Sequence, residues 1–169
     1  MPNSVVILIL IISIITDLHN RKILNIVTFP AILTALIYYF FTSGLEGFLF
    51  SGQGLLIGIG LLFIPFIMGG IGAGDVKLLA AVGAWQGSLF IFYTGIYAGL
   101  IGGLIAVYIL LKRREAIVTL KRMLFSVILL RSAKGSLLIK DDVNSSFTIP
   151  YAIPIALGAL LTFLMELNQ

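Results

Sequence analysis

Two aspartates stand beside apolar stretches of the chain. Asp17 follows an apolar run that begins near Val5, and Asp75 follows the glycine-rich run 69–74. A carboxylate near hydrocarbon is energetically costly, so its presence indicates a functional role. Two carboxylates brought close together do not readily both ionise, and the pair shares one proton. One can then act as base on a water while the other donates to a scissile carbonyl, which is general acid–base hydrolysis of a peptide bond.

Each aspartate also has a structural alternative. Asp75 can open a helix and accept hydrogen bonds from its first backbone amides. Asp17 can pair with Arg21 or Lys22 in the headgroup region. Neither aspartate suffices alone for acid–base hydrolysis, so the catalytic interpretation requires both to lie at the same membrane depth and converge.

Other polar residues near the aspartates are weaker signals. Gly72 and Gly74 lack side chains, so they can let a substrate backbone come close or shape the loop. Lys77 can tune the site or meet an acidic substrate residue, with snorkelling to the headgroups as the alternative. His19 is the single histidine and the chain has no cysteine, so we expect no metal site. Nothing in the sequence resembles a nucleotide or redox site, so we expect no organic cofactor.

The composition indicates a protein built inside a bilayer. The chain has 169 residues, of which 60% are hydrophobic and 11% charged, with a mean hydropathy of +1.15. One helical span needs about 20 apolar residues, so this length allows roughly five to seven spans and leaves no room for a separate soluble domain. We therefore expect an all-α, polytopic transmembrane helical bundle in which residues 1–169 form one membrane-embedded domain.

Apolar runs and the breaks between them predict about six helices. Their expected ranges are 2–16, 26–41, 54–68, 76–85, 88–111 and 149–167. A short connection is expected over 42–53. The turn near Gln86 would place Trp85 at the membrane–water boundary as an anchor. Close helix packing is expected at four glycines: Gly95, Gly99, Gly102 and Gly103.

The charges orient these helices. All eleven lysines and arginines fall on one side of the expected topology. The positive-inside rule makes that side cytoplasmic and leaves both termini outside. The net charge of +4 then indicates anionic lipid headgroups rather than nucleic acid as partner. Within the cytoplasmic segment 112–146, helical spacing of apolar residues predicts an interfacial amphipathic helix, with a buried or re-entrant segment as the alternative.

Two motifs together resemble a known family. The stretch D-L-H-N-R-K-I-L-N begins at Asp17, and the stretch G-A-G-D-V-K-L-L places Asp75 in a GxGD motif. This resembles the type IV prepilin peptidases, whose pattern is an Asp followed six residues later by Ile-Pro-Asn, and then GxGDxK leading a helix. The segment 149–158 is similar to the family's last, proline-containing helix. Leu24 stands where the family usually has proline, which leaves the shape of the first loop open.

The resemblance implies a membrane aspartic endopeptidase with Asp17 and Asp75 as the catalytic pair. It would remove the basic leader from prepilin-like substrates at the cytoplasmic membrane face, as in type IV pilus assembly and protein secretion. The chain looks like the short, peptidase-only branch, without the family's methyltransferase portion. Type IV pilins, pseudopilins and preflagellins all remain open as substrates, and the oligomeric state is unknown.

Two further functions are alternatives to the peptidase. A small proton- or cation-coupled transporter would use the same aspartates as titrating sites. A structural membrane subunit would tolerate replacement of either aspartate by asparagine.

Overall fold

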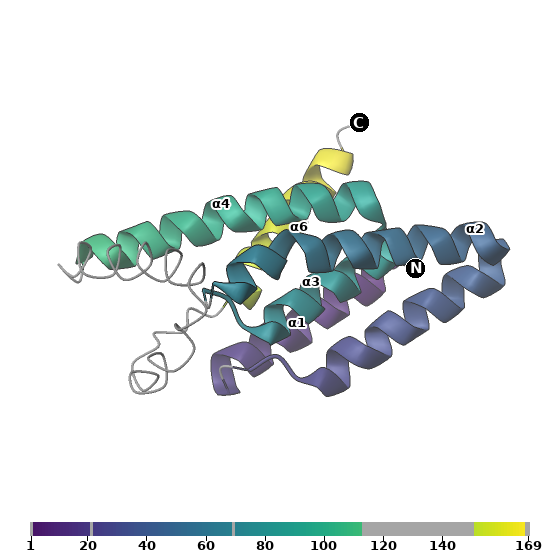
Figure 1. Cartoon of the computed structure of the whole chain (residues 1–169), viewed down its shortest axis with the longest axis horizontal. Coiled ribbons are helices and arrows are strands. Elements are labelled where there is room, and N and C mark those ends of the chain that lie inside the picture. Colours follow the sequence, from purple (N-terminus) through teal and green to yellow (C-terminus); the bar gives the residue numbers. More distant parts are fainter. Residues whose placement is uncertain (1, 21, 69, 113–150, 168–169) are drawn as a thin grey trace, which may run out of the picture. The chain divides into compact units, whose positions relative to one another are not determined.

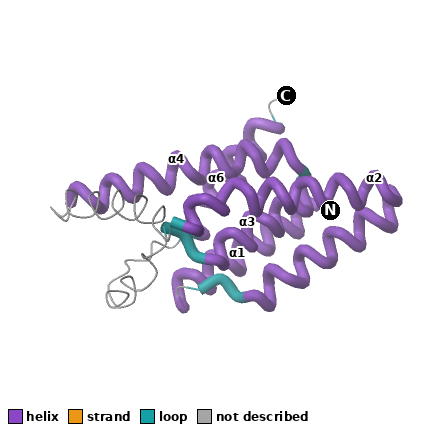
Figure 2. Tube along the Cα trace, in the orientation of Figure 1, coloured by secondary structure: helices purple, strands orange, loops and turns teal. Residues whose placement is uncertain are grey.

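The computed structural model describes residues 2–20, 22–68, 70–112 and 151–167, which form five helices. They are α1 (Pro2–Asn20), α2 (Asn25–Ile67), α3 (Ala73–Gln86), α4 (Ser88–Lys112) and α6 (Ala152–Glu166) (Figures 1 and 2). The chain divides into two compact units, the first made of Met1–Gly102 with Pro150–Gln169 and the second of Gly103–Ile149. Both aspartates lie in the first unit. Beyond Lys112, the predicted interfacial segment 112–146 lies outside the described residues.

Three of the helices are long and apolar enough to cross a membrane. They are α1, α2 and the part of α4 from Ser88 to Tyr108. Large apolar side chains such as Ile11 and Leu100 are exposed along them, which is the surface that lipid covers in a membrane protein. The all-helical membrane class predicted from composition is therefore confirmed. The count of six crossings and their orientation stay predictions.

The longest helix, α2, is a hairpin of two arms. Gly44 has φ 61° and ψ −139°, outside helical geometry, and in Figure 1 the chain reverses direction at the turn, so that the second arm runs back from it. A positive φ costs glycine little because it has no Cβ. Helix continues on either side of Gly44, so the connection expected over 42–53 was too long: a single residue makes the turn.

Helix α3 is the short central helix of the first unit. Its 14 residues extend about 21 Å at the usual rise per residue, less than a bilayer core. It contacts α1, α2 and α6, and from Leu78 to Trp85 every side chain is buried. The helix begins three residues before its predicted start, so Asp75 lies inside its first turn.

The second arm of α2 packs on α3 through glycines. A Cβ added to Gly58 would lie 2.7 Å from the carbonyl oxygen of Leu79, and one added to Gly54 would overlap the carbonyl oxygen of Gly83. Gly54 and Gly58 are four residues apart and share one helix face. This small-residue spacing lets the two backbones approach closely, which fixes the depth of α3 and of Asp75 with it.

Trp85 is buried in the protein and does not face outward as an anchor would. Its side chain is 5% exposed and its indole N–H donates to the carbonyl oxygen of Ala31 at 2.9 Å. The hydroxyl of Tyr39 donates to the carbonyl oxygen of Trp85 at 2.7 Å. The predicted anchoring role was wrong because the first arm of α2 covers the end of α3 and supplies the indole with a partner.

Candidate active site

Asp17 is held by the two helices that meet at its carboxylate. Helix α1 continues to Asn20, four residues beyond its predicted end, so Asp17 lies in its last turns with only 6% of its surface exposed. The backbone N–H of Ala152 donates to Asp17 Oδ2 at 3.2 Å. Ala152 is the first residue of α6, and the positive end of a helix dipole stabilises a carboxylate there.

Asp75 is fixed by the start of α3. Gly72 is the N-cap residue of this helix, and its N–H donates to Asp75 Oδ2 at 3.1 Å. Asp75 is therefore not the N-cap residue considered from the sequence: it is the third residue of the helix, and its carboxylate reaches back to cap the N–H of Gly72. The side chain is nevertheless 7% exposed, so this cap faces the protein interior and not the solvent.

The charge of Asp17 affects the carboxyl group of Asp75. The pKa of Asp75 is raised to about 7. Burial is the larger cause and the charge of Asp17 is the second, while the hydrogen bond from the N–H of Gly72 partly opposes the rise. An effect of one charge on the other's pKa requires the two groups to be neighbours. The structure thus brings together the two aspartates singled out from the sequence, from α1 and α3. Near neutral pH Asp75 is therefore poised between its protonated and charged forms.

Tyr151 is a third polar group beside the aspartates. Burial, and then the negative charge of Asp75, raise the pKa of its phenol. Its hydroxyl also lies against α4, because a Cβ at Gly102 would come within 2.5 Å of it. Sequence reasoning gave Tyr151 no role. The only signal for it was the segment 149–158, whose similarity to the family's last helix pointed to a helix and not to a contact with Asp75.

The two glycines of the GxGD motif make room for protein groups. A Cβ at Gly72 would lie 3.1 Å from Asp75 Oδ2, and a Cβ at Gly74 would lie 2.9 Å from the Cβ of Ile23. Because Gly72 has no side chain, the Asp75 carboxylate can fold back toward the start of its helix. Because Gly74 has none, the loop after α1 can lie against α3. This geometry supports loop shaping over substrate contact, although their predicted functional role stays a prediction.

Lys77 points toward the start of α2. Its Nζ donates to Asn25 Oδ1 at 2.8 Å and lies 5.0 Å from the centroid of the Phe29 ring. The cation therefore joins α3 to α2 through a hydrogen bond and a cation–π contact. Its tuning of the site stays a prediction.

Leu24 has a backbone that proline can adopt. It is the N-cap residue of α2, with φ −76° and ψ 129°, and the φ of proline is about −65 ± 15°. We expect Leu24→Pro to keep the fold and the activity, and to raise the stability by about 0.4–1 kcal/mol by restricting the unfolded chain. Thermal unfolding in detergent measures the change in stability. Ile26→Ala is the control, because it also changes an exposed apolar side chain near the start of α2. A loss of fold in Leu24→Pro would show that the loop needs the leucine amide.

Metal-ligating side chains do not gather in the part of the chain that the structure describes. No group of three or more His, Asp or Glu side chains there is placed to hold a metal ion. His19 is exposed near the end of α1.

Comparison with known proteins places these residues in a family. The model of the type IV leader peptidase family matches residues 4–107, a range that contains both aspartates and ends before α6. No curated protein and no solved structure matches the chain. The matched range covers more than half of the sequence and includes α1, α2 and α3, the helices that carry and position the acidic pair. The chain belongs to the type IV leader peptidase family, a family of aspartic peptidases.

Proposed function

We propose that this protein is a membrane aspartic endopeptidase that cleaves the basic N-terminal leader from prepilin-like proteins at the cytoplasmic face of the membrane. The observation that carries the proposal is the pair of buried, electrostatically coupled carboxylates of Asp17 and Asp75 in a chain of the leader peptidase family. The substrate is a type IV pilin, pseudopilin or preflagellin whose apolar helix follows the leader. The reaction uses no metal or organic cofactor.

The environments of the two carboxylates support different roles. Asp17 accepts the N–H of Ala152, which holds its carboxylate in place at the start of α6. Asp75, with a pKa raised to about 7, keeps its proton below that pH. Asp17 is therefore the base that takes a proton from water, and Asp75 is the acid that protonates the scissile carbonyl.

The proton balance closes over one cycle. The water oxygen bonds to the carbonyl carbon while Asp17 receives a water proton and Asp75 gives its own to the carbonyl oxygen. In the second step Asp75 takes a proton back from one hydroxyl of this intermediate as the carbonyl reforms. Asp17 gives its proton to the leaving nitrogen, the C–N bond breaks, and the pair returns to its starting state.

Peptide cleavage by purified protein tests the proposal. A synthetic peptide with a basic leader and an apolar segment is incubated with the protein in detergent, and products are identified by mass spectrometry. We expect one cut at the end of the leader in wild type. Cation-dependent flux in vesicles without any hydrolysis would instead establish the transporter.

The pH dependence follows from Asp75. Because its pKa is raised to about 7, the proton that the acid must donate is present below that pH and lost above it. We expect kcat/KM to fall about tenfold for each pH unit above about 7. A peptide without groups that titrate in this range isolates the enzyme's contribution. A rate that stays level well into the alkaline range would show that Asp75 does not act as the acid.

A further inference from the structure

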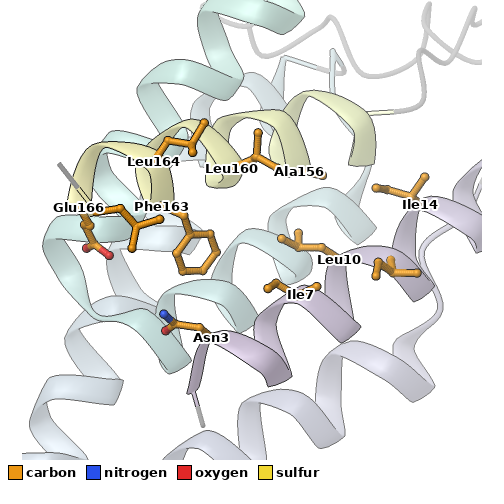
Figure 3. A pocket seen from close by; sticks show the side chains of 11 residues that line it. Asn3, Ile7, Leu10, Ile14, Ala156, Leu160, Phe163, Leu164 and Glu166 are labelled. Carbon is orange, nitrogen blue, oxygen red and sulfur yellow. The ribbon is translucent and has the colours of Figure 1, made fainter.

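An apolar groove runs between α1 and α6. Its volume is about 470 Å³, and its walls are formed by side chains such as Ile7, Ile11, Leu160 and Leu164. Figure 3 shows these two helices on either side of it. All its lining residues belong to the first unit of the chain. A groove of this size accommodates several side chains of a bound segment.

One end of the groove lies beside the aspartates. Ile14 is three residues from Asp17 along α1, and Ala156 is four residues from Ala152 along α6; both Ile14 and Ala156 line the groove. The hydrogen bond from Ala152 to Asp17 joins the two walls just past this end. A chain whose scissile bond lies at the acidic pair therefore reaches the groove within about one helical turn.

The other end carries a negative charge. Asn3 and Glu166 lie together there (Figure 3), about 16 Å from Ile14 at the helical rise per residue. Glu166 is the one charged side chain among the described residues that line the groove. An occupant must therefore be apolar along most of its length and neutral or cationic, but not acidic, at this far end.

The charge argues against a lipid chain. An acyl chain lying in the groove would place either its apolar end or its phosphate against the Glu166 carboxylate. The first contact gives the carboxylate no polar group beyond Asn3, and the second sets the phosphate, with any headgroup cation beyond it, against a like charge. A peptide helix avoids both, because one of its side chains can be polar or cationic where the groove ends.

We propose that the groove between α1 and α6 binds the apolar helix that follows the scissile bond in the substrate. The first residues after the cut enter between Ile14 and Ala156. About eleven residues further, a polar or cationic side chain meets Glu166. This inference rests on the proposed peptidase function and adds to it the surface that recognises the substrate's membrane segment.

Filling the groove tests the proposal. Ile11→Trp and Leu160→Trp place a large side chain in it, while Leu33→Trp changes a similarly exposed residue on α2, outside it. Each variant is given a long peptide, with the complete apolar helix, and a short one that ends a few residues after the cut. We expect both groove variants to raise KM for the long peptide about tenfold or more. Cleavage of the short peptide should stay at the wild-type rate, which also shows that the variants fold.

The charge at the far end gives an independent measurement. Long peptides with lysine or glutamate about eleven residues after the cut are compared on wild type and on Glu166→Lys. Wild type should prefer lysine and the variant glutamate. A photoreactive side chain placed at Leu164 should capture the long peptide in preference to lipid.

The outcomes separate the two proposals. If wild type cleaves both peptides while the tryptophan variants leave KM for the long one unchanged, the groove proposal is wrong and the peptidase stands. Capture of lipid alone at Leu164, or equal use of both charged peptides, overturns it as well. If wild type cleaves neither peptide, the peptidase and the groove proposal both fail.

Discussion

Asp17→Asn and Asp75→Asn should each lower kcat for leader cleavage by at least about a thousandfold, the range expected when a positioned acid or base is removed. Asparagine keeps the size and much of the hydrogen bonding of each side chain. The N–H of Ala152 can still donate to residue 17, and that of Gly72 to residue 75. The loss then reports the missing proton transfer and not a collapsed site.

The double variant should be no slower than the worse single one. The two carboxylates share one proton cycle, so removing either stops both steps, and effects of groups that act as a unit are not additive. Glu46→Gln serves as the matched control because it neutralises an exposed acid on α2 and should cut at the wild-type rate. Unfolding temperatures in detergent verify that all the variants fold. Normal cleavage by either single variant would disprove the shared-proton mechanism.

The acidic pair could be predicted because it depends only on both aspartates lying at the same surface of the membrane. Asp17 and Asp75 each follow an apolar segment, and a bilayer confines the ends of such segments to two surfaces. Two carboxylates at the same surface of a small helical bundle cannot lie far apart. The sequence pattern therefore predicted convergence without any knowledge of which helices touch.

The groups around the pair could not be predicted in this way. The N–H of Ala152 reaches Asp17 across 135 residues, and Tyr151 lies near Asp75. Both contacts depend on how α6 docks, and periodicity does not report docking. The prediction for Trp85 fails for the same reason. An indole can lie at a membrane interface or donate to a buried carbonyl equally well, and only the fold of the α2 hairpin decides between the two.

Helix packing shows a related limit. Glycine content predicted close contacts along α4. Gly95 lies against Leu61 of α2 and Gly102 against Tyr151, the residue before α6, while a Cβ at Gly99 or Gly103 would meet nothing within 4 Å. Backbone-to-backbone contacts occur at Gly54 and Gly58 of α2, and α4 takes part in one through Thr94 and Ala98, against Gly158 of α6. A glycine pattern indicates that a helix can be approached closely, but the neighbouring helix is set by the turns that connect them.

Gly54→Ala should therefore be the most destabilising glycine-to-alanine substitution among the residues that the structure describes. The new Cβ overlaps the carbonyl oxygen of Gly83, and a Cβ on Gly83 would in turn overlap that of Gly54. Because both groups are backbone, the helices must separate, and we expect a loss of about 3 kcal/mol or more, at the upper end for overpacking. Reversible unfolding in mixed detergent measures the change.

Gly60→Ala is the matched control on the same arm of α2. A Cβ there meets nothing within 4 Å, so alanine should add up to about 1 kcal/mol through its better helix propensity. Separation of α2 from α3 would also displace Asp75, so Gly54→Ala should lose peptidase activity under conditions where Gly60→Ala keeps it. Equal stabilities for the two variants would mean that α2 and α3 do not meet at Gly54, and that the depth of Asp75 is set by its own loop and by α1 instead.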